Sequence, residues 1–295
     1  MRYNFLRNIK KKSLMKKIDL LPEDFDYEKY ALQNNFLNLL NIKELPENPG
    51  KKLVHDKDFS VDPENKVPYP SEIDDLSRLH YITLSRKVTT ILEFGVGKSS
   101  IILADALRIN KNRDYEYTSK NLRRGNLYEC YSVDNYPEWI KECSKNIPKD
   151  LVDNKFLNLN QTNVFTSEFS GRICTYYECL PNIAPDLIYL DGPDQYSPKG
   201  EIRGLSTRHK DRMPMVADII SFEHFLHPGT LIIIDGRTAN ARFMKSNFQR
   251  NWAHLYVEEW DQHFFELLED PLGLYNRRMI DFCLGEKFYR RLNNS

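Results

Sequence analysis

The sequence predicts an α/β fold in which helices cover both faces of a doubly wound, mostly parallel sheet. Four short runs are apolar without polar alternation, as in buried parallel strands, namely residues 89–94, 128–133, 186–190 and 230–234. Stretches with helical periodicity separate these runs. An acidic residue stands in or directly after each run. In such sheets, ligands bind beyond the carboxyl ends of the strands, so these acids are the first candidates for a functional site.

The first half of this region contains helices and strands in alternation. A helix is expected over residues 71–86, where Ser71-Glu-Ile-Asp74 has the pattern of a capping box. The strand at 89–94 leads into a helix over residues 99–107. Residues 110–126 then form a polar and basic insertion before the second strand.

The second half continues the alternation and adds a hairpin. Two runs on either side of Ser170-Gly171 predict this hairpin, at residues 164–169 and 172–177. The remaining helices are expected at residues 137–146, 213–226 and 238–248. The tail, residues 252–284, contains three short strand-like pieces, including 264–268 and 279–283.

The first 70 residues are expected to form an extension that is partly helical, around residues 27–40, and residues 71–295 a single domain. Residues 1–17 contain seven Lys or Arg and no acid. This segment has two interpretations: a basic amphipathic helix for a membrane surface or an RNA, or a solvated terminus.

Composition excludes several classes of protein. The net charge is zero, so no global field attracts nucleic acid or an anionic membrane. The five cysteines are odd in number and form no C-x-x-C pair, which predicts reduced thiols and a cytoplasmic protein. No apolar run approaches the length of a membrane span, and no signal-peptide pattern follows the start. The sequence leaves the oligomeric state open.

The most informative motif is Ile91-Leu-Glu-Phe-Gly-Val-Gly-Lys-Ser-Ser100. Gly95 and Gly97 allow a ligand to approach the backbone where a strand turns into a helix. Glu93 would repel a pyrophosphate, but it suits a ligand that carries positive charge and hydroxyls. A phosphate-binding P-loop would need glycine where Leu92 stands. A plain strand-to-helix turn, with glycines for packing only, remains the alternative.

Three more acids end predicted strands. Asp134 can accept two charge-assisted hydrogen bonds from vicinal ribose hydroxyls, or cap the helix that follows. Asp191 stands in Pro185-Asp-Leu-Ile-Tyr-Leu-Asp-Gly-Pro193, and Asp235 in Leu231-Ile-Ile-Ile-Asp-Gly-Arg237. Because adjacent strands lie about 4.8 Å apart, these two carboxylates are expected to converge on one cleft.

Together these motifs resemble those of the class I S-adenosylmethionine-dependent methyltransferases. The first motif of that superfamily is an acid followed by three alternating glycines, and Ser99 replaces the third glycine here. The Asp191-Gly-Pro193 variant is similar to small-molecule and sugar O-methyltransferases. The resemblance implies a seven-stranded sheet with an antiparallel last strand and S-adenosyl-L-methionine as cofactor.

The resemblance also assigns residues to the cofactor. Its binding residues would be Glu93, Gly95, Gly97, Ser99, Asp134, Asn135 and Asp191, with Asn135 and Tyr136 bordering the adenine. The insertion at residues 110–126 explains why Asp134 stands farther from Glu93 than is usual in the superfamily.

Asp191 and Asp235 are the candidate catalytic residues, as general base or as a pair of Mg²⁺ ligands. The sequence favours chemistry without a metal, because Gly236 and Arg237 stand where metal-dependent relatives have another ligand. His224 and His227 could pair on a metal, but no third ligand is evident, so interaction with the helix C-terminus is the simpler interpretation.

Tyr196 and Arg237 are expected to contact the substrate, beside a basic stretch over residues 194–214. This stretch is either a lid that attracts an anionic substrate or a solvated charge run. The sequence therefore predicts methyl transfer to a small molecule or sugar, at oxygen, with an anionic acceptor. The alternatives are a non-catalytic nucleotide-binding module and a nucleic-acid methyltransferase; the latter would need a base-stacking motif that Asp191-Gly-Pro-Asp194 does not supply.

Overall fold

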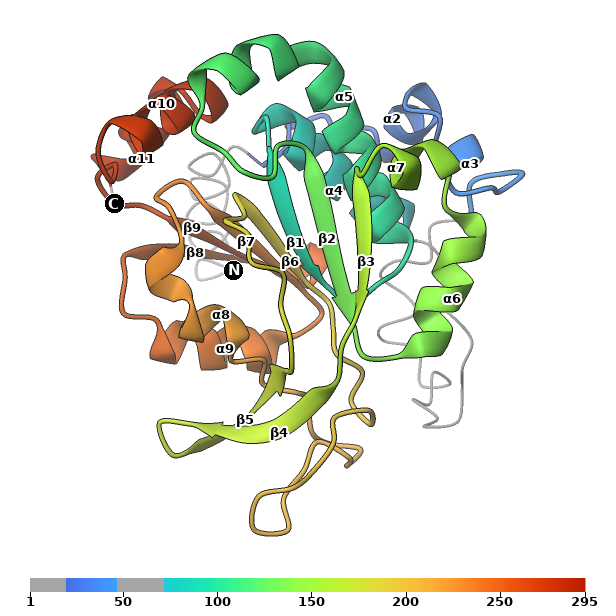
Figure 1. Cartoon of the computed structure of the whole chain (residues 1–295), viewed down its shortest axis with the longest axis vertical. Coiled ribbons are helices and arrows are strands. Elements are labelled where there is room, and N and C mark those ends of the chain that lie inside the picture. Colours follow the sequence, from blue (N-terminus) through green and yellow to red (C-terminus); the bar gives the residue numbers. More distant parts are fainter. Residues whose placement is uncertain (1–19, 47–71, 295) are drawn as a thin grey trace, which may run out of the picture.

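A seven-stranded sheet forms the centre of the protein, as seen in a computed structural model that describes residues 20–46 and 72–294 (Figure 1). The strand order is β3-β2-β1-β6-β7-β9-β8. The strands are β1 (Thr90–Phe94), β2 (Glu129–Asp134), β3 (Leu157–Gln161), β6 (Leu187–Leu190), β7 (Leu231–Asp235), β8 (Trp252–Val257) and β9 (Gln262–Leu267). Strand order reverses beside β1, so ligand-binding residues are expected at the carboxyl ends of β1, β2 and β6.

The sheet is mostly parallel, as the sequence predicts. β9 pairs antiparallel with both β7 and β8, and the other neighbouring pairs are parallel. The expected seven-stranded sheet with an antiparallel last strand is therefore confirmed.

Alternate residues of each strand face two hydrophobic layers. Ile91 and Ile233 pack with α4 (Ile73–Ser85) and α5 (Lys98–Asn121). Leu92 and Ile232 face the other layer, with α8 (Asp218–Ser221) and α9 (Thr238–Asn247). Helices α6 (Pro137–Asn146) and α7 (Lys149–Asp153) lie beside β3, and α10 (Leu274–Cys283) and α11 (Glu286–Leu292) follow the last strand.

The described part of the N-terminal extension packs on the first of these layers. Helices α2 (Tyr27–Gln33) and α3 (Phe36–Leu39) bury Ala31 and Phe36 in the same core as α4 and α5. The hydroxyl of Tyr30 bonds His80 Nδ1 at 2.8 Å. The boundary predicted at residue 70 and the basic segment 1–17 lie outside the described residues, and both stay predictions.

Four local predictions are wrong. Helix α5 continues through most of the expected polar insertion, because its long polar stretch lies on the surface while its first turns are buried. The helix expected at 213–226 is reduced to α8 and a short 3-10 turn, Glu223–Phe225, since the residues before it pair with the hairpin. Residues 279–283 belong to α10 and form no strand. Helix α4 begins at Ile73 with Glu72 as N-cap and no side-chain cap, later than the capping box predicts; Ser71 is not among the described residues.

The hairpin is confirmed, and it lies beyond the carboxyl edge of the sheet (Figure 1). Its strands are β4 (Val164–Phe169) and β5 (Arg172–Tyr177), paired antiparallel. Lys199 bridges β4 and Val216 bridges β5, so the segment after β6 runs along both sides of the hairpin. We call the hairpin and residues 194–217 the cap.

Within the described ranges, no helix is both long enough and apolar enough to cross a membrane. All five cysteine thiols are free.

Candidate active site

The turn after β1 packs directly against the turn after β6. Gly95 has φ +103°, a conformation that glycine adopts without strain. A Cβ on Gly95 would lie 3.1 Å from the backbone nitrogen of Gly192, and a Cβ on Gly192 would lie 2.7 Å from the nitrogen of Gly95. Gly95 thus serves close backbone packing, the role that the sequence analysis kept as the alternative to ligand approach.

Gly97 differs from Gly95 in its surroundings. Its φ of −168° is an extended conformation that any residue can adopt. Within 4 Å, a Cβ on Gly97 would contact Ser99 Oγ alone among the described residues, at 3.8 Å. Neither strain nor packing therefore requires glycine at this position. The space beside Gly97 is where a ligand could reach the start of α5.

Glu93 is completely buried below this turn. Its carboxylate accepts hydrogen bonds from Ser99 Oγ and Ser100 Oγ, both at 2.5 Å, and from Ser132 Oγ. Burial raises the pKa of Glu93 to about 7, although the three hydroxyls oppose this shift. Because the serines enclose it, Glu93 acts on the turn through Ser99 and Ser100, which lie in the first turn of α5.

Asp134 connects the ends of β1 and β2. Its Oδ2 accepts from the Val96 N–H, between the two glycines, and its Oδ1 from the Tyr136 N–H, both at 2.8 Å. Burial raises the pKa of Asp134, and these backbone bonds oppose the shift. The neighbouring Oδ1 of Asn135 is buried and has no hydrogen-bond partner.

Asp191 directly follows β6 and Asp235 is the last residue of β7, and these strands are neighbours in which Leu190 pairs with Ile234. The negative charge of Asp191 contributes to the raised pKa of Asp235, after burial and Asp75. Desolvation raises the pKa of Asp191 to about 6, while Arg237 opposes the rise. The side chain of Asp191 is 56% exposed, so water moderates this shift.

Arg237, which is predicted to contact the substrate, contacts Asp191. One Nη donates to the main-chain carbonyl of Asp191, and Nε is 3.8 Å from its carboxylate, too far for a hydrogen bond. The other Nη reaches the sulfur of Met213 at 3.6 Å. Nε is buried and has no hydrogen-bond partner.

Helix α4 adds acids that the sequence-based interpretation missed. Gln262 donates to Asp235 at 2.9 Å and also to Asp75, so one amide joins the two carboxyls. Burial raises the pKa of Glu72 to about 7, and Asp191 is among the charges that add to this rise. Asp75 and Gln262 could not be found from the sequence, because they stand far from each other and outside any motif.

The cap contains Tyr196 and the basic residues of the predicted lid. The hydroxyl of Tyr196 is buried and has no hydrogen-bond partner in the part of the chain that the structure describes. Asp194 holds the turn by accepting from the Tyr196 N–H at 2.8 Å, and Lys199 donates to Asn163 at 2.7 Å. The stretch is therefore anchored to the start of the hairpin.

In the part of the chain that the structure describes, no group of three or more His, Cys, Asp or Glu is arranged to hold a metal ion. The carboxylates of Asp191 and Asp235 instead have Arg237 and Gln262 as neighbours.

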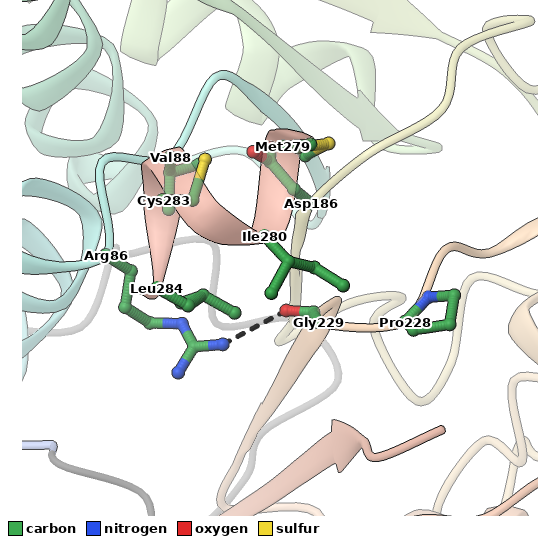
Figure 2. A pocket seen from close by; sticks show the side chains of 9 residues that line it. All are labelled: Arg86, Val88, Asp186, Pro228, Gly229, Met279, Ile280, Cys283 and Leu284. Atoms are coloured by element: carbon green, nitrogen blue, oxygen red, sulfur yellow. Dashed lines mark hydrogen bonds between the residues drawn. The ribbon is translucent and has the colours of Figure 1, made fainter. Parts of the chain in front are cut away.

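Two small cavities lie at the opposite, amino edge of the strands. The one in Figure 2, about 20 Å³, is lined by the residues that precede β1, β6 and β7 and by α10, and Arg86 donates to the carbonyl of Gly229 across it. The other, about 70 Å³, lies near Arg124 and His227. Neither touches the strand-end acids, and we place the site at the carboxyl edge because the unpartnered polar atoms gather there.

No family model and no curated protein matches this sequence. Among solved structures, the chain is similar to methyltransferase PaMTH1 of Podospora anserina bound to SAH, with 13% identity, 84% of this chain and 98% of the other covered, and a TM-score of 0.41. It is also similar to the O-methyltransferase TomG of Streptomyces achromogenes in complex with SAM (11% identity, 82% and 98% covered, TM-score 0.38). A third similar structure is the O-methyltransferase of Bacillus cereus in complex with SAH, with 12% identity, 85% of this chain and 93% of the other covered, and a TM-score of 0.37. These low scores carry no functional argument.

Proposed function

We propose that this protein is an S-adenosylmethionine-dependent methyltransferase that acts on a small molecule. One observation carries the proposal: Asp134 bonds the N–H of Val96, so the acid at the end of β2 and the glycine turn after β1 form one unit. A carboxylate has four acceptor positions, so Asp134 keeps acceptor capacity for a ribose hydroxyl beside its backbone hydrogen bonds. The open side of Gly97 then admits the rest of the ligand.

The acids at the carboxyl edge of the sheet support a cationic ligand. Glu72, Asp75, Asp191 and Asp235 stand close enough for their charges to raise one another's pKa. When it is ionised, Asp191, the exposed member of this cluster, attracts the sulfonium and ammonium of S-adenosylmethionine. The unpartnered Oδ1 of Asn135 supplies an acceptor for the adenine amino group.

Asp191 is the proposed general base, since its carboxyl is exposed and its pKa is raised above the ordinary value toward neutral pH. The acceptor oxygen attacks the methyl carbon, the carbon–sulfur bond breaks, and the proton of the acceptor passes to Asp191. Asp235, whose pKa is raised far above its ordinary value, would stay protonated and donate a hydrogen bond. The cleft then needs no metal.

We further propose an anionic acceptor that binds between Arg237, Tyr196 and the basic cap. Two hydrogen-bond donors, Arg237 Nε and the Tyr196 hydroxyl, have no acceptor among the described residues. A carboxylate or phosphate of the substrate would supply this acceptor. Lys199, Arg203 and Arg208 of the cap add positive charge on the same edge.

Isothermal titration calorimetry with S-adenosylhomocysteine, ATP and NAD tests the cofactor. The wild type is expected to bind S-adenosylhomocysteine only, and Asp134→Asn to weaken binding by about 1.5–3 kcal/mol. The valine side chain of Gly97→Val should occupy the space through which the ligand reaches the start of α5, and so abolish binding of S-adenosylhomocysteine. Gly125→Val is the matched control, because a Cβ at Gly125 meets nothing within 4 Å.

Binding of ATP or NAD in place of S-adenosylhomocysteine would contradict the proposal. It would favour the alternative of a nucleotide-binding module without methyl transfer.

A further inference from the structure

Tyr177 ends β5, at the base of the cap, and is held rigidly there. Its ring packs against Phe94 with centroids 5.2 Å apart, and its N–H donates to the carboxylate of Asp218 at 3.1 Å. Only 5% of the residue is exposed. Phe94 is the last residue of β1, so Tyr177 lies directly below the glycine turn.

The hydroxyl of Tyr177 is buried and has no hydrogen-bond partner among residues 20–46 and 72–294. A Cβ on Gly192 would lie 2.8 Å from it and 2.7 Å from the nitrogen of Gly95, so the hydroxyl reaches the contact between the two turns. A buried polar group without a partner is costly, and at this point it is explained if a ligand supplies the partner.

The charges around this hydroxyl are those of the proposed site. Asp134 and Asp191 raise the pKa of Tyr177 in addition to burial, and Arg237 lowers it. Burial raises this pKa well above the ordinary value, so the hydroxyl keeps its proton and can donate. Arg237 contacts the same Asp191–Gly192 peptide through the Asp191 carbonyl.

The order of the strands indicates which part of the ligand comes here. Asp134, the proposed ribose partner, ends β2, whereas Gly192 follows β6, with β1 between them. Two strand spacings amount to about 10 Å, a distance that the amino-acid half of an S-adenosyl ligand covers from its ribose. That half carries a carboxylate, an acceptor for a hydroxyl donor.

We propose that the Tyr177 hydroxyl is a cofactor-binding group that donates a hydrogen bond to the carboxylate of the amino-acid half of S-adenosylmethionine. This rests on the proposed function and adds a residue of the hairpin to the cofactor site. The hairpin would thereby connect cofactor binding to residues 194–217 of the cap.

The test uses two probes on the full-length chain: S-adenosylhomocysteine, and 5′-methylthioadenosine, which lacks the amino-acid half. Tyr177→Phe is expected to raise the Kd of S-adenosylhomocysteine about tenfold, because one hydrogen bond to a charged group is lost. The Kd of 5′-methylthioadenosine should change by no more than about twofold. Tyr176→Phe is the matched control, because the neighbouring side chain points to the other side of β5.

Thermal unfolding without ligand separates binding from structure. Since the hydroxyl has no protein partner, Tyr177→Phe should leave the Tm unchanged or raise it, whereas a lower Tm would show that the hydroxyl is structural and would overturn the inference. Equal affinity of wild type and Tyr177→Phe for S-adenosylhomocysteine would also overturn it, as would equal weakening of both probes. Absence of S-adenosylhomocysteine binding in the wild type would instead overturn the proposed function itself.

Discussion

Replacement of Glu93 by Gln should change how the stability of the protein depends on pH. The Glu93 carboxyl is fully buried, and its pKa is raised from 4.5 to about 7. The folded state therefore holds this proton more tightly than the unfolded state. The resulting stabilisation is present below about pH 4.5 and is lost as the pH rises to about 7. Gln has nearly the same shape and does not titrate.

The magnitude follows from the two pKa values. One pKa unit corresponds to about 1.36 kcal/mol, so the change from 4.5 to about 7 amounts to about 3 kcal/mol. The free energy of unfolding of Glu93→Gln, minus that of the wild type, should therefore increase by about 3 kcal/mol between about pH 4 and about pH 8. Titrating groups that do not interact with Glu93 contribute equally to both proteins and cancel in this difference.

Urea denaturation of both proteins at a series of pH values measures this difference. Ser100→Ala provides a further check, because it removes a hydroxyl that stabilises the ionised carboxylate. In that variant the loss of stability should extend to higher pH. Parallel pH profiles for wild type and Glu93→Gln would refute the reasoning, since they would mean that the carboxyl titrates alike in both states.

Three further predictions concern packing and the substrate. Gly192→Ala should destabilise the protein by about 1–3 kcal/mol in urea denaturation, because its Cβ would lie 2.7 Å from the Gly95 nitrogen; an unchanged midpoint would contradict the close packing of the two turns. Phe264→Ala should cost about 3–5 kcal/mol, since this ring of β9 is completely buried, and a loss below about 1 kcal/mol would show that the core closes around the cavity. Arg237→Lys should raise the KM for an anionic acceptor severalfold and leave the Kd of S-adenosylhomocysteine unchanged, because lysine keeps the charge but lacks the planar group; a preference for neutral acceptors that the substitution does not alter would refute the anionic acceptor.

The sequence alone was sufficient for β1, β2, β6 and β7 and for the edge of the sheet at which the candidate residues lie, but it did not predict β3. The apolar runs of β1, β2, β6 and β7 are long enough to indicate buried strands, and the acids Glu93, Asp134, Asp191 and Asp235 stand in or directly after them. Parallel strands bring such ends to one edge whatever the side chains between them are. Local pattern was a poorer guide where a short apolar run suits either structure, as at residues 279–283, which belong to α10.

Only the tertiary structure decided what each of these residues contacts. The three serine hydroxyls around Glu93 come from α5 and β2, the amide of Gln262 reaches Asp75 of α4, and the unpartnered hydroxyl of Tyr177 comes from the hairpin. Gly95 and Gly97 look equivalent in the sequence, yet the first packs against Gly192 and the second is open. Partners from distant segments leave no periodic pattern along the chain. Burial, and with it the pKa of a buried carboxyl, depends on those partners and so could not be derived from the sequence.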